Sequence, residues 1–183
     1  MVFYDQSGGG VTCSGGEPLA QPTFLESLLR ECKRREIHTT LDTTCYAPWE
    51  VLEAVGRYVD LFLVDLKHMD AAVHQRLTGV SNEPILRNLL GLVQLKKEVI
   101  VRIPIIPGLT DSHENITATA EFVASLGGVS RVDILPHNGA ARGKVGRLAA
   151  QREVLQVDTP SQERMSGLAA KLESYGFFVK IGG

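Results

Sequence analysis

Short runs rich in β-branched and aliphatic residues recur along the chain, and each is separated from the next by a more polar, helix-like stretch. Most of these runs are apolar at successive positions rather than at every second one, which is typical of parallel strands covered on both faces. The strands that we predict are Val11–Ser14, His38–Thr43, Leu61–Leu66, Val99–Ile105, Arg131–Leu135 and Phe177–Ile181.

The stretches between these strands carry apolar residues at helical spacing, and most begin with a residue that favours a helix start. The predicted helices are one that begins at Pro22 with the apolar face Phe24, Leu25, Leu28, Leu29 and Cys32, one over Pro48–Tyr58, one opened by Asn82 and Pro84, one capped by Asp111, and one in which Thr159 and Gln162 form a capping box around Pro160. Gly139–Val157 is the least periodic stretch and reads as a long loop. The alternation of strand and helix predicts an α/β fold with a parallel sheet.

Length, composition and charge narrow the class of protein. The 183 residues fit a single domain, which we place at residues 1–183. Lys and Arg number 19 against 21 Asp and Glu, a net charge of −2, which argues against binding to nucleic acid. No apolar run approaches the ~20 residues that cross a bilayer, and we expect no signal peptide. Three cysteines cannot all pair, so they do not form a disulfide scaffold. We therefore expect a cytoplasmic protein, and the short apolar runs predict that it binds no membrane.

Polar residues lie at or just after the ends of the predicted strands. They are Glu17, Asp42, Thr43, Asp65, Lys67, Arg102, His137 and Asn138. The strands could form an open doubly wound sheet or part of a barrel, and the convergence of polar strand ends on one rim favours the barrel. Taken singly, Asp42 could cap a helix and Arg102 could be a structural ion pair. Together, these residues predict the rim of an enzyme.

The glycine-rich segment Gly8–Leu19, GGGVTCSGGEPL, is the most distinctive part of the sequence. Glycines beside a short strand let a ligand approach the backbone closely, because no Cβ intervenes. The spacing matches neither the dinucleotide fingerprint G-x-G-x-x-G nor the phosphate loop that ends in G-K-[ST]. The segment therefore predicts a ligand at the end of the first strand that neither of these motifs describes.

Several motifs follow this segment in a characteristic order. They are SGGEPL, HTTLDTT, DLFLVDLKHMD, LTGVSN, VRIPIIPGLTD and DILPHN. In this succession the chain resembles the glycyl-radical-enzyme activating enzymes, relatives of the pyruvate formate-lyase activating enzyme in the radical S-adenosylmethionine superfamily. The resemblance extends from about Ser7 to Leu148.

The resemblance implies a partial (β/α)6 TIM-like barrel, of which this chain would hold about five β/α units with the first one missing. It implies S-adenosylmethionine at the carboxyl-terminal rim and a [4Fe–4S] cluster that passes an electron to it. A 5′-deoxyadenosyl radical then removes hydrogen from a glycine of a partner glycyl radical enzyme, and a flavodoxin or ferredoxin serves as electron donor. In such enzymes the protein supplies orientation while the cofactor carries the chemistry.

The resemblance also assigns roles to residues. In Ser14-Gly15-Gly16-Glu17 the backbone would receive the ammonium group of S-adenosylmethionine. The residues Asp42, Thr43, Asp65, Lys67 and Arg102 would lie near its ribose and carboxylate, and Asp42, Thr43 and Asp65 match a monovalent-cation site of some members. Carboxylates suit hydroxyls and an ammonium group, and Lys67 suits a carboxylate. No residue of this chain is assigned a catalytic role.

The cysteines depart from the family pattern. The family's cluster needs three thiolates at C-x3-C-x2-C, whereas Cys13, Cys32 and Cys45 are 19 and 13 positions apart. We therefore expect an N-terminally truncated barrel without a cluster or activity of its own, the cluster belonging to the full-length parent. We expect Cys13 and Cys45, on neighbouring strands, to be buried thiols that could approach each other, and Cys32 to be a packing residue.

The histidines depart from the pattern as well. The family commonly has a histidine where this chain has Asn138, and His137 comes one residue earlier. Neighbouring residues of a strand point in opposite directions, so either side chain could reach the ligand. His38, His74 and His113 have no ligand spacing and read as surface or strand-edge residues.

Two other functions fit parts of the sequence. Lys67 at a strand end could be the amine nucleophile of a Schiff-base aldolase, although the SGGE strand would then have no explanation. The same fold could also be a docking module that grips a partner's loop without chemistry.

Overall fold

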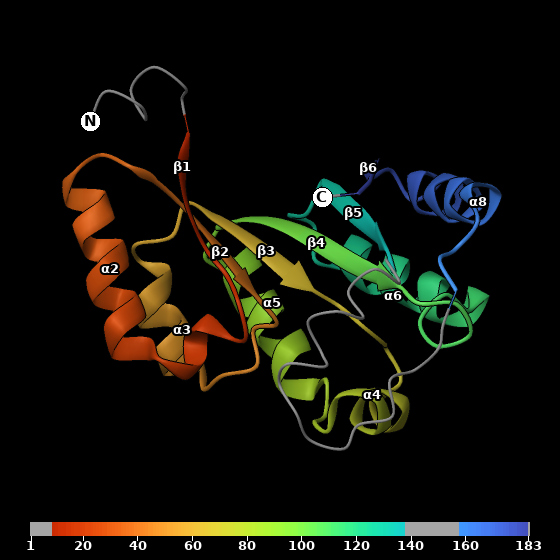
Figure 1. Cartoon of the computed structure of the whole chain (residues 1–183), viewed down its shortest axis with the longest axis horizontal. Coiled ribbons are helices and arrows are strands. Elements are labelled where there is room, and N and C mark those ends of the chain that lie inside the picture. The colour runs from red at the N-terminus through yellow and green to blue at the C-terminus, as the bar shows by residue number, and fades with distance from the viewer. Residues whose placement is uncertain (1–8, 138–157, 183) are drawn as a thin grey trace.

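The computed structural model describes residues 9–137 and 158–182. Its centre is one parallel sheet of six strands in the order β1-β2-β3-β4-β5-β6, so each strand pairs with its neighbours in sequence (Figure 1). A doubly wound sheet reverses its strand order part-way, so that alternative is wrong. The sequential order is that of a partial barrel.

The strands agree with the predicted ones to within one residue at each end. They are β1 Gly10–Cys13, β2 His38–Thr43, β3 Leu61–Asp65, β4 Glu98–Ile105, β5 Arg131–Pro136 and β6 Phe178–Ile181. Their inward side chains form the core, with Leu41, Phe62, Val101 and Ile134 fully or almost fully buried. The strand predictions are confirmed because these runs are apolar enough to be covered on both faces.

Helices follow the strands and cover the sheet. They are α2 Pro22–Arg34, α3 Trp49–Gly56, α4 Ala71–Thr78, α5 Glu83–Gln94, α6 His113–Ser125 and α8 Gln162–Glu173. α2 and α3 pack together beside β1 and β2, and α6 and α8 pack together at the other end of the sheet (Figure 1). None of the helices in the described ranges has the length and apolarity to span a membrane.

Two predicted caps are wrong by one or two residues. Ser112 caps α6 in place of Asp111, and Ser161 caps α8 in place of Thr159. The Asp111 carboxylate accepts a hydrogen bond from the Gly108 N–H at 2.7 Å and forms an ion pair with Arg164. Asp111 therefore holds its own loop rather than the helix end.

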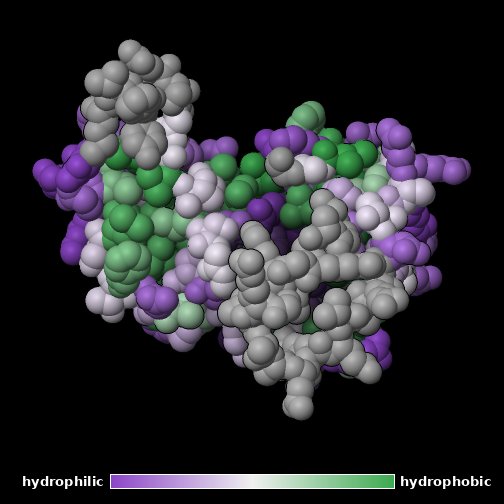
Figure 2. Space-filling view, in the orientation of Figure 1, coloured by the Kyte–Doolittle hydropathy of each residue, from purple (hydrophilic) through white to green (hydrophobic). Residues whose placement is uncertain are grey.

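The predicted apolar face of α2 is only partly buried. Leu25, Leu29 and Cys32 face the core, whereas Phe24 is 66% exposed and Leu28 is 37% exposed. Figure 2 shows hydrophobic residues gathered at the end of the molecule formed by α2 and β1. β1 is the edge strand of the described sheet, so no further β/α unit among these residues covers that end.

α3 and α5 approach each other closely at one glycine. A Cβ on Gly91 would come within 2.4 Å of the Trp49 indole ring, so only a glycine leaves room for this ring between the helices. The amide of Asn88, one turn earlier on α5, donates to the carbonyl oxygens of Cys45 and Ala47, both at 2.8 Å. These contacts fix the loop that follows β2.

Candidate active site

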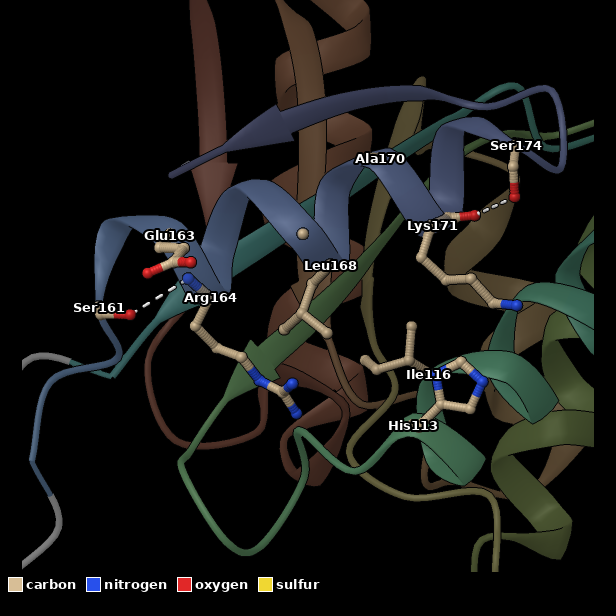
Figure 3. Close-up of a pocket in the computed structure, with 10 residues that line it drawn as sticks. His113, Ile116, Ser161, Glu163, Arg164, Leu168, Ala170, Lys171 and Ser174 are labelled. Atoms are coloured by element: carbon tan, nitrogen blue, oxygen red, sulfur yellow. Dashed lines mark hydrogen bonds between the residues drawn. The ribbon is translucent and has the colours of Figure 1, made fainter.

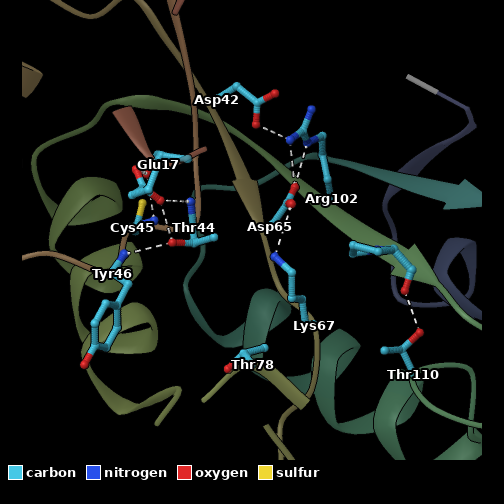
Figure 4. A network of polar contacts seen from close by, with 12 residues as sticks. Glu17, Asp42, Thr44, Cys45, Tyr46, Asp65, Lys67, Thr78, Arg102 and Thr110 are labelled. Atoms are coloured by element: carbon cyan, nitrogen blue, oxygen red, sulfur yellow. Dashed lines mark hydrogen bonds and ion pairs between the residues drawn. The ribbon is translucent and has the colours of Figure 1, made fainter. Parts of the chain in front are cut away.

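Two carboxylates and a guanidinium meet at the carboxyl ends of three neighbouring strands. Arg102 on β4 lies directly across from Asp65 on β3, and its Nε donates to Asp65 Oδ1 at 2.9 Å. The Arg102 Nη2 forms an ion pair with the same oxygen at 2.8 Å and a second one with Asp42 Oδ1 on β2 (Figure 4). The parallel register therefore brings together three residues that the sequence spreads over 60 positions.

The cluster is partly shielded from water and balanced in charge. The side chains of Arg102, Asp42 and Asp65 are 14%, 23% and 20% exposed. Burial would lower the pKa of Arg102, but Asp65 and Asp42 together outweigh burial and raise it. Lys67 adds a second cation, with Nζ at 3.4 Å from Asp65 Oδ2. Two carboxylates thus face two cations, a surface suited to a zwitterionic ligand with hydroxyl groups.

Glu17 has a structural role that the sequence did not suggest. Its Oε1 accepts from the Thr43 hydroxyl at 2.7 Å and the Leu19 N–H at 3.1 Å. Its Oε2 accepts from the Thr44 N–H at 2.9 Å and the Thr44 hydroxyl at 2.6 Å. The Glu17 carboxylate therefore ties the loop after β1 to the loop after β2, which leaves the backbone of this segment to meet a ligand.

The backbone beside Glu17 is open. Gly15 and Gly16 have φ angles of +91° and +52°, and a Cβ on either residue would have no atom within 4 Å. A φ of +91° strongly favours glycine. The Ser14 hydroxyl donates to Asp42 Oδ2 at 3.0 Å and so connects this loop to the charged cluster. This hydrogen bond places the loop directly beside the cluster.

The residues expected to bind a monovalent cation are already engaged by other groups of the protein. Asp42 and Asp65 share Arg102 as their cation, while the Thr43 hydroxyl donates to Glu17 and accepts from the Cys45 N–H at 2.9 Å. Within residues 9–137 and 158–182, no three His, Cys, Asp or Glu side chains are grouped to hold a metal ion. The cation site remains a prediction.

All three cysteines are buried and free. Burial raises the pKa of Cys45 well above its ordinary value, with Glu17 and Asp65 adding to the effect. Burial, together with nearby Cys32, also raises the pKa of Cys13. Cys32 packs on the inner face of α2, as expected. Burial therefore disfavours the thiolate form of Cys13 and Cys45, which is the form that binds metal.

The structure corrects the predicted location of His74 and does not test whether His137 or Asn138 reaches the ligand. His74 was expected at the surface or a strand edge, but it lies on α4 and is only 3% exposed. The sequence did carry a signal for α4, because Asp70 caps its start and Gly79 ends it with a φ of +88°. His137 follows β5, and its N–H donates to the Ile105 carbonyl at 3.0 Å. Asn138 lies outside the described residues.

A broad hollow of about 850 Å³ lies away from the charged cluster, between α6 and α8 (Figure 3). Arg164 and Lys171 extend from α8 along it, and His113 stands on the α6 side. Arg164 is paired with Asp111, and Lys171 lies 5.4 Å from the ring centre of Tyr175. We therefore assign the chemistry to the strand ends rather than to this hollow.

Comparison with known proteins identifies the family of the chain. The family model described as the radical SAM superfamily matches residues 3–120. The chain belongs to this superfamily. A crystal structure of a domain of pyruvate-formate lyase-activating enzyme from Bacteroides vulgatus superimposes with a TM-score of 0.81 at 36% identity, covering 96% of this chain and 99% of that domain. The predicted partial barrel is thereby confirmed.

The curated relatives that are similar to this chain are activating enzymes. The choline trimethylamine-lyase activating enzyme of Oleidesulfovibrio alaskensis is 37% identical over 98% of this chain and 59% of its own length. The trans-4-hydroxy-L-proline dehydratase activating enzyme of Clostridioides difficile is 36% identical over 100% of this chain and 61% of its own length. The resemblance to glycyl-radical-enzyme activating enzymes is thus confirmed. The chain spans about three fifths of the length of these two relatives.

The radical SAM family uses S-adenosylmethionine and a [4Fe–4S] cluster, and the described residues fit these two groups differently. The open glycine backbone and the balanced charges at the strand ends suit S-adenosylmethionine, which carries an ammonium, a carboxylate and two ribose hydroxyls. The described cysteines do not suit the cluster, because they are buried and not grouped.

Proposed function

We propose that this chain is the S-adenosylmethionine-binding barrel of an activating enzyme that installs a glycyl radical on a partner enzyme. The observation that carries the proposal is the Asp42–Arg102–Asp65–Lys67 cluster at the strand ends, beside the open backbone of Gly15. The relatives named above are activating enzymes of this kind and match nearly the whole chain.

Different residues of the chain would bind different groups of S-adenosylmethionine. Lys67 is the cation best placed to bind the ligand's carboxylate, because its contact with Asp65 is long at 3.4 Å and its side chain is 31% exposed. Arg102 is held by both carboxylates and so keeps Asp42 and Asp65 fixed for the ribose hydroxyls. The backbone at Ser14–Glu17 would take the ammonium group. When bound and reduced by one electron, S-adenosylmethionine would supply the radical chemistry that removes hydrogen from the partner's glycine.

The remaining parts of the proposal concern the parent protein. We propose that the full-length protein holds the [4Fe–4S] cluster, that a flavodoxin or ferredoxin reduces it, and that the protein acts in the cytoplasm. We propose residues 1–183 as a single barrel domain that binds the cofactor without completing the reaction.

The aldolase alternative has less support. A Schiff-base lysine needs a desolvated amine, whereas Lys67 stands beside a carboxylate and is about one-third exposed. Borohydride trapping with a carbonyl substrate would reveal such an amine.

The test of ligand binding is Lys67→Ala in the full-length protein. Loss of a charge-assisted contact of about 1.5–3 kcal/mol should weaken S-adenosylmethionine binding roughly 10- to 150-fold by calorimetry. Lys33 is a poor control, because it forms an ion pair with Asp60. Lys180 on β6 is exposed and has no ion pair among the described residues, so Lys180→Ala is the matched variant. Equal dissociation constants for the two variants would remove Lys67 from the site.

The test of activity is formation of a glycyl radical on the partner. The full-length protein, S-adenosylmethionine and a reductant should give an electron paramagnetic resonance signal on the partner, and 5′-deoxyadenosine should form in step with it. Methionine and 5′-deoxyadenosine without a protein radical would point to another hydrogen donor.

A further inference from the structure

A cavity of about 250 Å³ adjoins the charged cluster. Lys67 belongs to both, because it lines the cavity and pairs with Asp65 of the cluster. The cavity's lining comes from the loops after β1, β2 and β3, from α4 and α5 and from the loop between these helices. It consists of Glu17, Thr44, Tyr46, Lys67, His74, Thr78, Val80 and Ile85. In Figure 4, Lys67 stands between Asp65 and Thr78. A group in this cavity would therefore lie next to whatever the charged cluster binds.

His74 presents an unused hydrogen-bond acceptor at this cavity. Its Nδ1 lies 2.8 Å from the Val80 carbonyl oxygen, which can only accept, so Nδ1 carries the proton of the neutral ring. The Thr78 hydroxyl, 3.1 Å from Nδ1, donates to the His74 carbonyl at 2.8 Å and is likewise an acceptor for the ring. Nε2 is left with a lone pair and has no partner among the described residues. It is not one of their buried unpaired atoms, so solvent reaches this nitrogen although the residue as a whole is only 3% exposed. A donor group of a ligand in the cavity could therefore take the place of water at this nitrogen.

The rest of the cavity is largely apolar. Tyr46, Val80 and Ile85 supply hydrophobic walls, and Glu17 is already engaged by four donors. A volume near 250 Å³ is below the ~300–1,000 Å³ of ordinary small-molecule pockets and suits one side chain. The cavity therefore favours an apolar body with one hydrogen-bond donor at its tip.

We propose that this cavity binds one side chain of the polypeptide on which the enzyme acts, an apolar or aromatic side chain whose hydroxyl or N–H donates to Nε2 of His74. This proposal rests on the proposed function, which makes a polypeptide the second substrate. Tyr46, 44% exposed, places the cavity within reach of a chain lying across the strand ends. Anchoring one side chain there would fix the register of that polypeptide beside the cofactor.

The experiment uses three capped amino acids as probes and nuclear magnetic resonance of the histidine ring nitrogens. N-acetyl-tyrosinamide should bind saturably to the chain and shift the Nε2 signal of His74. N-acetyl-phenylalaninamide, which lacks only the hydroxyl, should bind about 2- to 10-fold more weakly, the worth of one neutral hydrogen bond. N-acetyl-alaninamide should bind more weakly still. Equal affinity of the tyrosine and phenylalanine probes, an unmoved Nε2 signal, or no saturable binding of any probe would overturn the proposal.

Variants separate the acceptor from the fold. His74→Asn keeps an N–H donor for the Val80 carbonyl but lacks the Nε2 acceptor, so the two aromatic probes should bind equally. His113→Asn, at the exposed start of α6, is the matched control and should change nothing. If His74→Asn does not fold, Val80→Phe tests the same cavity by filling it from a half-buried wall position and should abolish binding of both probes.

The outcomes also separate this proposal from the proposed function. Calorimetry with S-adenosylmethionine reports on the charged cluster, and the probes report on the cavity. Probe binding without S-adenosylmethionine binding would keep the cavity as a side-chain site but overturn the proposed function, and with it the polypeptide substrate as the occupant. The reverse result would keep the cofactor site and overturn the role of His74.

Discussion

Arg102→Met should destabilise the protein strongly, because it leaves two carboxylates facing each other without their shared cation. Arg102 is 14% exposed and contacts both Asp42 and Asp65, whose side chains are 23% and 20% exposed. Breaking a fully buried ion pair costs about 3–5 kcal/mol, and a charge-assisted hydrogen bond contributes about 1.5–3 kcal/mol. With some water still reaching the carboxylates, we expect the free energy of unfolding to fall by about 2–4 kcal/mol.

The measurement is urea unfolding followed by circular dichroism, with Arg164→Met as the control. Arg164 also pairs with an aspartate, but its side chain is 46% exposed, so its removal should cost less than about 1 kcal/mol. In the Arg102→Met background, Asp42→Asn should become less costly or even stabilising, since it removes one of two like charges. If Arg102→Met lowers the free energy of unfolding no more than Arg164→Met does, Arg102 is not the shared counter-ion of the two aspartates.

Three further outcomes are expected. Anaerobic reconstitution of this chain should yield no iron–sulfur cluster, whereas about four irons per chain after desalting would point to Cys13 and Cys45 as ligands. The outer edge of β1, which pairs with no other described strand, and the exposed Phe24 should cause self-association in light scattering at roughly 10–100 µM, and a clean monomer would show that the edge is protected. Burial would raise the pKa of Asp60, but the Lys33 ammonium and the Thr39 N–H and hydroxyl lower it overall. Its stabilisation is therefore present above the unfolded pKa and lost in acid, so Asp60→Asn should cost stability at pH 7 and progressively less below about pH 4; an equal cost at both would contradict this sign.

The order of strands and helices could be predicted because it depends on local patterns. β2 was predicted at its observed bounds, His38–Thr43, since a run of β-branched and aliphatic residues specifies a buried strand by itself. α4 was missed because it is short and His74 is its only buried residue, so it carries no apolar stripe. The exposure of Phe24 depends on how α2 is turned against the sheet, and helical spacing does not report that.

The sequence by itself determined which residue types stand at the strand ends, because parallel strands carry their carboxyl ends to one rim. Only the tertiary structure decided how they pair. Arg102 meets Asp65 across 37 positions and Asp42 across 60, and the Ser14 hydroxyl meets Asp42 across 28. The engagement of Glu17 with the loop after β2 and the free Nε2 of His74 likewise depend on segments brought together from different β/α units. Such contacts follow from strand order and register, which act over the whole sheet, whereas a sequence pattern reports only on the residues within one element.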